Sequence, residues 1–362
     1  MSMTINGTSG LVFNDASTQN TSAFLGGLAF RNRIINGAMM IDQRNAGASV
    51  TPAPGTFVSD RWAYNATQTS KVSTQQNAGS VTPPVGFANY LGVTSLSSYS
   101  IVSSDTFQLY QGIEGFNTSD LQWGTANAQT VTLSFWVRSS LTGTFGGSLS
   151  NSSVTRSYPF SYTISAANTW EQKTVTIAGD TTGTWVGATS GVGVRVYFSL
   201  GSGSTYSGTA GAWAGSDFRS ATGAVSVVGT NGATFYITGV QLEKGSTATS
   251  FDYRPYGTEL ALCQRYFYRG VIAYSGVIGG GSGTVPFGGY AWPETMRTTP
   301  TATWNSGGSI DNGSSSFNIT SLNGLFNGSP DGAYLAFNIG SNATIGRGCC
   351  FFNINASFSA EL

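Results

Sequence analysis

The pattern of hydrophobic and polar positions predicts β-strands along most of the chain. In residues 131–138 and 191–200, apolar residues occupy every second position, as in a strand that buries one face. The side chains expected to face the core are Val131, Leu133, Phe135 and Val137 in the first segment, and Val192, Val194, Val196, Phe198 and Leu200 in the second.

Shorter segments of the same kind follow one another, separated by turns rich in glycine, serine and asparagine. This spacing of strands and turns predicts a jelly-roll β-sandwich. Strands do not alternate regularly with helices, which disfavours a Rossmann fold or a TIM barrel. The shorter strands are expected at residues 106–113, 161–165, 173–179 and 234–242.

One helix is expected, over residues 257–270. Gly257 or Thr258 is positioned to cap its first turn, and Gly270 is a typical residue just beyond a helix. Sequence patterns typical of strands resume after this helix. About ninety residues remain, which is enough for a smaller β-domain. Its strands are expected within residues 270–280, 284–296, 300–304, 333–339 and 348–362.

The first 33 residues contain short apolar pieces between turn formers and no sustained period. We expect this segment to be an extended arm that becomes ordered by docking on another protein. The predicted organisation of the all-β chain is therefore an arm at 1–33, a jelly-roll sandwich at 34–256, a connecting helix at 257–270 and a C-terminal β-domain at 271–362.

Composition narrows the classes of function. Hydrophobic residues make up 40% of the 362, enough for a core, whereas charged residues make up only 9%. Such a surface of hydroxyl and amide groups is typical of a protein held in a large assembly or of one that binds uncharged ligands such as sugars. The formal net charge is zero, which argues against nucleic-acid binding.

The sequence contains few features that indicate targeting or redox chemistry. We expect no leader, and the sequence has no run of 18 apolar residues, so we also expect no membrane insertion. We expect synthesis in a cytoplasm, with any exit from the cell by another route such as lysis. The three cysteines are expected to be buried and reduced.

Catalytic options are limited because the chain contains no histidine, which excludes His-dependent relays and His-ligated metals. An enzyme would have to use carboxylates, and Asp105, Glu114 and Asp120 lie in one stretch, as a carboxylate-pair glycosidase would require. We instead expect these residues in turns beside strands. The sequence predicts that the protein is not an enzyme and that it has no catalytic residue, metal or cofactor.

Aromatic side chains are the better candidates for binding, because their faces stack on sugar rings. Core packing or subunit contact remains the commoner role of any one tryptophan. Tyr290, Trp292 and Trp304 lie near one another in the sequence of the distal domain, so we predict them as its ligand-binding residues. The other tryptophans considered for this role are Trp123, Trp136, Trp185 and Trp213.

Four segments, residues 34–62, 114–149, 162–185 and 231–267, closely resemble bacteriophage tail-fibre and related virion proteins. In that family these segments run in the same order through a jelly-roll domain similar to carbohydrate-binding modules. The resemblance spans about residues 30–270, and the beginning of the chain also looks like the virion-attachment start of such fibres. The C-terminal domain resembles the family only in outline.

The resemblance implies a homotrimeric tail fibre, assembled in the host cytoplasm. Its arm would bind other tail or baseplate proteins, and its C-terminal domain would bind host surface polysaccharide. Carbohydrate-binding modules of this type often hold calcium with an acidic residue in the last strand, where this chain has Thr238 and Gly239, so no calcium is expected. Two alternatives remain open: a head-decoration fibre on the capsid, and a glycan depolymerase.

Overall fold

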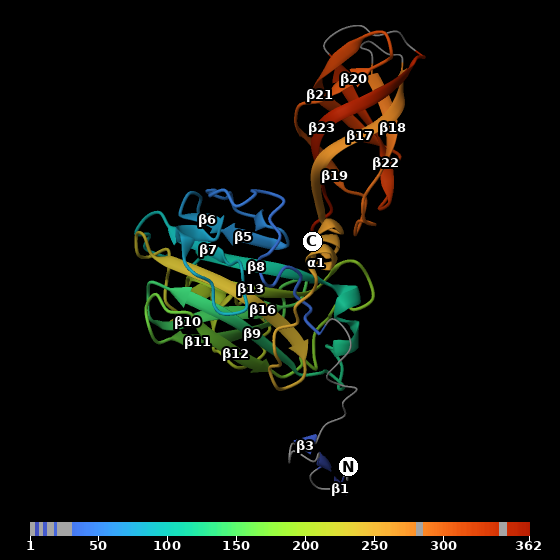
Figure 1. The fold of residues 1–362 in the computed structure, drawn as a ribbon. Helices are drawn as coiled ribbons and strands as arrows, with labels where there is room; N and C mark the ends of the chain where they lie inside the picture. The colour runs from blue at the N-terminus through green and yellow to red at the C-terminus, as the bar shows by residue number, and fades with distance from the viewer. Residues whose placement is uncertain (1–3, 7–9, 13–17, 20–30, 280–284, 340–345) are drawn as a thin grey trace. The chain divides into compact units, whose positions relative to one another are not determined.

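The computed structural model describes residues 4–6, 10–12, 18–19, 31–279, 285–339 and 346–362 (Figure 1). The chain divides into two units, Met1–Arg31 and Asn32–Leu362. In the first unit, short strands β1 (Thr4–Asn6), β2 (Gly10–Val12) and β3 (Thr18–Gln19) pair antiparallel. A small sheet therefore lies within the segment predicted as an arm. The other residues of this segment, as far as residue 30, lie outside the residues that the structure describes.

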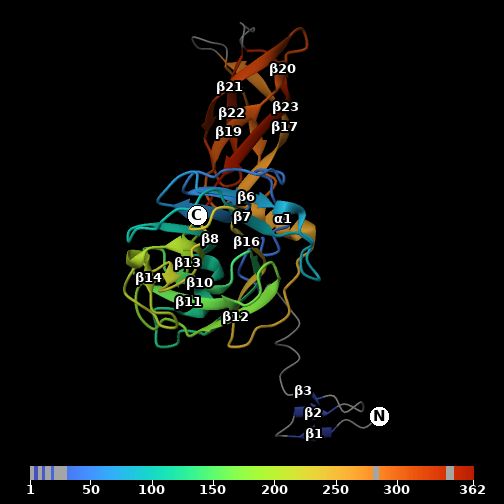
Figure 2. The same cartoon turned by 90° about the vertical axis from the view of Figure 1, so that its left-hand side faces the viewer.

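The second unit begins with a sandwich of two antiparallel sheets (Figures 1 and 2), which confirms the predicted all-β jelly-roll fold. The five-stranded sheet has the order β12-β9-β16-β7-β6, and the six-stranded sheet the order β11-β10-β13-β8-β5-β4. The strands are β4 (Thr56–Ser59), β5 (Trp62–Ala66), β6 (Val72–Gln76), β7 (Leu91–Ser95), β8 (Thr106–Glu114), β9 (Val131–Ser139), β10 (Gly143–Ser150), β11 (Ser157–Ile164), β12 (Glu171–Ile177), β13 (Val192–Ser202) and β16 (Thr234–Lys244).

Short elements fill the loops of the sandwich. A parallel pair of two-residue strands, β14 (Ser207–Gly208) and β15 (Ser220–Ala221), lies in the long connection between β13 and β16. The 3-10 turns are η2 (Ala78–Ser80), η3 (Gly115–Asn117), η4 (Ser119–Leu121) and η5 (Ser204–Tyr206).

The alternation in the sequence is what builds the core between the sheets. The predicted inward residues of β9 are fully buried, as are those of β13 from Val194 onward. Val192 is only half-buried, and a register irregularity in the pairing with β8 separates it from Val194. Across the core, Phe135 and Phe198 pack edge to face with ring centroids 5.0 Å apart, a geometry that stabilises aromatic pairs beyond their buried area.

The one α-helix among the described residues, α1 (Tyr256–Gln264), is shorter than the predicted 257–270. Pro255 occupies its N-cap, so neither Gly257 nor Thr258 caps it. The chain leaves the helix at Arg265 because Phe267 begins the next strand, pairing with Ser359. Long-range strand pairing of Phe267 thus overrides the helical pattern.

The C-terminal part forms a small β-barrel (Figure 1). Its strand order is β17-β18-β22-β21-β20-β23-β19, and a further pairing of β17 with β23 closes the sheet. The strands are β17 (Phe267–Gly279), β18 (Val285–Ala291), β19 (Thr301–Ser306), β20 (Ser309–Asp311), β21 (Ser316–Phe326), β22 (Gly332–Ile339) and β23 (Gly348–Ser359).

The three cysteines are free thiols. Cys263 and Cys349 are buried as expected, but Cys350 is exposed. That prediction was wrong for Cys350 because neighbouring residues of a strand point to opposite faces, so β23 can bury only one of the pair. No helix in the described parts of the chain is long and apolar enough to cross a membrane.

Candidate functional site

The three predicted ligand-binding residues lie in the barrel, but not on one surface. Trp292 is only 6% exposed, and its ring packs against Phe358 and Tyr290 with centroids 4.4 and 5.5 Å away. Its indole N–H donates to Ser329 O at 3.1 Å. These contacts make Trp292 a core residue.

Tyr290 and Trp304 are both half-buried. The Tyr290 hydroxyl lies 3.4 Å from that of Tyr268, and burial raises the pKa of Tyr290. Trp304 lies on β19, where its indole N–H donates to Gly307 O at 2.9 Å. The structure brings Tyr290 and Trp292 together, and a ligand-binding role for Tyr290 or Trp304 stays a prediction.

One open pocket of the barrel has a volume of about 630 Å³. Residues from four elements and one turn form it, and we call it the aromatic pocket. Pockets of this size, lined mainly by apolar and aromatic groups with a few polar ones, are typical of small-ligand sites. The lining residues are Gly279, Phe287, Asn323, Phe326, Asn327, Tyr334 and Ala336.

Strand register places the large rings among small residues. On β22, Tyr334 pairs with Gly289 of β18 on one side and with Phe326 of β21 on the other. Two residues along the same face, Ala336 pairs with Phe287 and Gly324.

The three rings are well exposed. Phe287, Phe326 and Tyr334 are 37%, 50% and 48% exposed, respectively. A cluster of exposed aromatic residues is uncommon on a soluble protein and marks an interaction site more often than a single exposed residue does. The small neighbours leave space between the rings.

The geometry of the rings is defined by their contacts. The Phe287 and Tyr334 centroids are 6.5 Å apart, with the ring planes inclined by 73°. A Cβ atom at Gly324 would come within 3.1 Å of the Phe326 ring, so glycine allows this ring to lie close to its own strand. Phe287 and Tyr334 therefore present differently oriented ring faces to the pocket.

Two amides supply the polar part of the aromatic pocket. Asn323 Nδ2 donates to Asn338 Oδ1 at 3.0 Å, and Asn338 Nδ2 donates to Ser321 Oγ at 2.8 Å. This chain of hydrogen bonds orients Asn323. Asn327 occupies the left-handed region with φ 47°, in the turn that follows β21. Amides both donate and accept hydrogen bonds, which suits them to bind hydroxyl groups.

The described lining of the aromatic pocket contains no charged side chain. Residues 271–362 contain six, and none of the charged residues that the structure describes lines the aromatic pocket. The undescribed ranges 280–284 and 340–345 contain no charged amino acid. The six are Glu294, Arg297, Asp311, Asp331, Arg347 and Glu361.

The sandwich tryptophans considered for stacking form a packed cluster. Trp123, Trp185 and Trp213 meet edge to face, with centroids 4.8 to 5.4 Å apart. Each indole N–H donates to a backbone carbonyl, of Gln129, Thr182 and Ala178 respectively. The cavity beside Trp123 and Trp185 holds only about 50 Å³. Trp136 is half-buried on β9.

The three carboxylates considered for catalysis have structural partners. Asp105 accepts hydrogen bonds from Thr67 and Tyr99 at 2.7 and 2.8 Å, and Asp120 pairs with Arg33 at 2.8 Å.

Glu114 accepts hydrogen bonds from Arg265 and Tyr266 at 2.6 Å each. Burial raises the pKa of Glu114, but these two partners outweigh that effect and hold the pKa below its ordinary value.

Nothing in the described sandwich or barrel forms a group of three or more His, Cys, Asp or Glu residues able to hold a metal ion. At the position considered for calcium, the Thr238 hydroxyl donates to Asn89 O at 2.7 Å.

A cluster of buried and partly buried charges joins residues from distant parts of the sequence. Arg44 pairs with Glu361 at 2.6 Å, and Arg61 also pairs with Glu361. Arg61 is 1% exposed and lies over the ring of Tyr266, 3.6 Å from its centroid. Arg297 donates to the carbonyls of Ala360 and Glu361 at 2.7 Å each. We call Arg44, Arg61, Tyr266, Arg297 and Glu361 the charge cluster.

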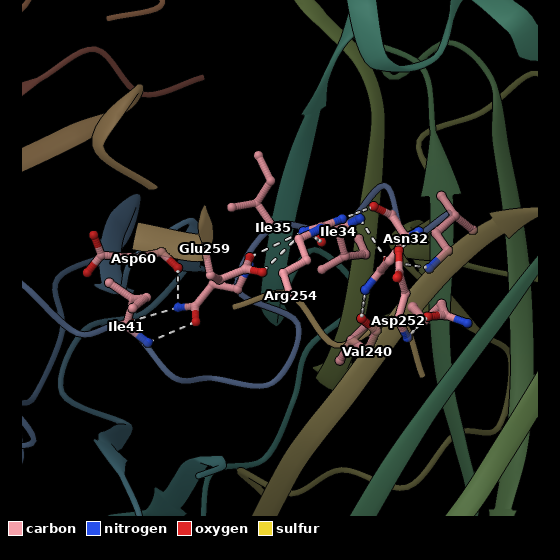
Figure 3. Close-up of polar contacts among 12 residues, drawn as sticks. Asn32, Ile34, Ile35, Ile41, Asp60, Val240, Asp252, Arg254 and Glu259 are labelled. Atoms are coloured by element: carbon pink, nitrogen blue, oxygen red, sulfur yellow. Dashed lines mark hydrogen bonds and ion pairs between the residues drawn. The ribbon is translucent and has the colours of Figure 1, made fainter. Parts of the chain in front are cut away.

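A second network fixes the start of the sandwich to the helix (Figure 3). Arg254 donates to Glu259 at 3.3 Å, to Ile34 O at 3.1 Å and to Asn32 O. The Asn32 side chain donates to Val240 O at 2.9 Å, and its backbone N–H to Asp252 at 3.2 Å. Asn32 and Arg33 therefore belong with the sandwich, just ahead of the boundary predicted at residue 34.

Asp60 gives a pH-dependent prediction. It is fully buried and accepts two hydrogen bonds from Gln43, at 2.7 and 2.6 Å. Burial raises its pKa from 3.8 to about 7, despite the opposing effects of Arg44 and Gln43. Between these values the folded state keeps a proton that the unfolded state releases, so the stability contributed by this group falls as pH rises.

We expect the stability contributed by Asp60 to fall by up to about 4 kcal/mol between about pH 4 and pH 7. The substitution Asp60→Asn should remove this part of the dependence of the free energy of unfolding on pH. Urea unfolding of both proteins across this pH range measures the difference. An Asp60→Asn profile parallel to that of the wild type would contradict the prediction.

Of the comparisons with known proteins, only the comparison with solved structures found similarities. No family model and no curated protein matches the chain. One similar structure is the enzymatically active domain of bacteriophage CBA120 tailspike protein 4, with 12% identity and a TM-score of 0.34. The match covers 59% of this chain but only 22% of the tailspike chain.

Two others are carbohydrate-binding modules. TmCBM61, solved with β-1,4-galactotriose, is 10% identical with a TM-score of 0.31, and the match covers 60% of this chain and 100% of the module. The family 11 module from Clostridium thermocellum, solved with a β-1,3-1,4-mixed-linked tetrasaccharide, is 10% identical with a TM-score of 0.27, covering 56% and 98%.

Proposed function

We propose that this chain is a structural fibre protein of a bacteriophage virion, which attaches to glycan on the host surface through its aromatic pocket. The observation that carries the proposal is the pocket itself, where three exposed rings and two amides meet without a charged group. Aromatic faces suit the C–H faces of sugar rings, and amides suit their hydroxyl groups.

Two further observations support the same function. The chain is poor in charge, with 9% charged residues, as suits a protein that works in an assembly or binds uncharged polymers. Four segments within about residues 30–270 resemble phage tail-fibre proteins and run in the same order along the chain. The proposal includes a homotrimer attached through residues 1–33 to tail or baseplate proteins, an arrangement that would multiply weak glycan contacts by avidity. It assigns the protein no catalytic activity.

The attachment function is tested by binding of fluorescently labelled protein to a panel of bacteria. The three lysines, Lys71, Lys173 and Lys244, all lie in the sandwich, so amine-reactive dye leaves the barrel side chains unmodified. Binding to some strains is expected, and periodate, which cleaves sugar diols, should abolish it. Binding that survives periodate but disappears after protease treatment of the cells would contradict a glycan receptor.

The virion assignment is tested separately by cryo-EM of phage particles that carry the protein. The expected image is a trimer anchored through its N-terminal segment to the tail. A monomer that is absent from particles would contradict the assignment, and trimers on the capsid would favour a head-decoration fibre.

A further inference from the structure

We infer that the ligand of the aromatic pocket is an uncharged oligosaccharide of at least two sugar units, which runs across strands β18, β22 and β21. This inference rests on the proposed function and specifies the class of glycan. It follows from the charge, the ring geometry and the amides of the aromatic pocket.

The absence of charge from the described lining selects neutral sugars. A uronic acid, sialic acid or phosphorylated sugar would bring an anion against the negative faces of aromatic rings. Desolvating a charged group without an oppositely charged partner is costly. The three arginines of the barrel strands and their connections are engaged elsewhere. Arg297 donates to Ala360 O and Glu361 O, Arg347 to Ser314 at 2.7 Å, and Arg269 to Arg44 O at 2.7 Å.

The inclination of the rings requires more than one sugar. Phe287 and Tyr334 are inclined by 73°, so one flat pyranose ring cannot stack on both faces. Tyr334 and Phe326 lie directly opposite each other on paired strands, which places Phe326 on the far side of Tyr334 from β18. Stacking positions therefore follow one another from Phe287 through Tyr334 to Phe326.

The amides lie at the Phe326 end of this row. Asn323 and Asn327 flank Phe326 in sequence, and both line the aromatic pocket. Asn323 is oriented by Asn338, so it is prepared to bond a hydroxyl group without first losing much side-chain freedom. The sugar at this end should therefore be the one whose hydroxyl pattern is recognised.

The test uses surface polysaccharide from a bacterium that the protein binds. The polysaccharide is partly hydrolysed, and the fragments are separated by anion exchange into neutral and acidic fractions and then by size. Each fraction competes with the cells for labelled full-length protein. Neutral fragments of two or more sugars are expected to inhibit at concentrations at least about tenfold lower than neutral monosaccharides. Inhibition should change little between about 0.05 M and 1 M salt.

Variants at the two ends of the row add an independent measurement. Phe287→Ala and Phe326→Ala are each expected to weaken inhibition by neutral disaccharides or trisaccharides about tenfold. Inhibition by the acidic fraction alone, or by monosaccharides as strongly as by longer fragments, would overturn the inference and leave glycan attachment standing. Failure of every fraction to inhibit would overturn both. If these variants abolished oligomerisation of the protein, the pocket would be shown to bind a second copy of the chain. That result would also overturn the inference.

Discussion

Replacing Arg61 with alanine is expected to lower the free energy of unfolding by about 3–5 kcal/mol. The Glu361 carboxylate, only 6% exposed, would lose one of its two arginine partners but would stay buried. The variant would also lose the hydrogen bond from Arg61 to Gly112 O at 2.5 Å and the contact with the Tyr266 ring. Urea unfolding followed by circular dichroism and tryptophan fluorescence measures the loss.

Two variants test whether this loss comes from removing one of the two arginines paired with Glu361. Arg347→Ala removes an exposed arginine of the barrel and should change the free energy of unfolding by no more than about 0.5 kcal/mol. Combining Arg61→Met with Glu361→Gln should recover part of the loss, because it removes the Arg61–Glu361 pair at similar volume and leaves only Arg44, whose side chain is 14% exposed, without that carboxylate. A loss below about 1 kcal/mol in Arg61→Ala would show that the charge cluster contributes little to stability.

The double substitution Phe326→Ala, Tyr334→Ala is expected to weaken attachment to cells at least about 100-fold. Removing an aromatic residue at the centre of an interface commonly costs about 2 kcal/mol or more, and two such losses exceed the energy of a 100-fold change. Both rings are about half exposed, so their truncation should affect folding far less than that of a core residue. Titration of labelled protein on a responsive strain measures the change.

Phe352→Ala is the matched control. Phe352 is 44% exposed on β23 and is not among the residues that line the aromatic pocket. Its truncation should leave attachment unchanged. Equal weakening by Phe352→Ala and by the double variant would indicate a general effect of the barrel surface, and unchanged binding by the double variant would exclude the aromatic pocket from attachment.

Much of the sandwich was predictable because local alternation determines which face of a strand is buried. Val131 to Val137 in β9 are the clearest example, since the pattern alone identifies all four core residues. The end of the helix was not predictable in this way, because it depends on the pairing of Phe267 with Ser359. Barrel closure through β17 and β23 likewise depends on residues far apart in sequence.

The candidate site was only partly predictable, and for the same reason. Tyr290 and Trp292 were predicted to bind ligand because they are close in sequence, yet Trp292 packs in the core. Phe287, Tyr334 and Phe326 come from three strands, and only register brings them together. One signal was present: in β22, Leu335 and Phe337 alternate with Tyr334, so a large ring falls on the outward face.

The charge cluster also constrains the order in which the protein is completed. Arg61 and Glu361 are separated by 300 residues. At roughly 5–20 residues per second, the ribosome needs about 15–60 s to make the intervening chain. During that interval the sandwich strands can pair, but Arg61 and Arg44 have not yet met their carboxylate. The nascent sandwich is therefore expected to gain its full stability only after the barrel sequence has been synthesised.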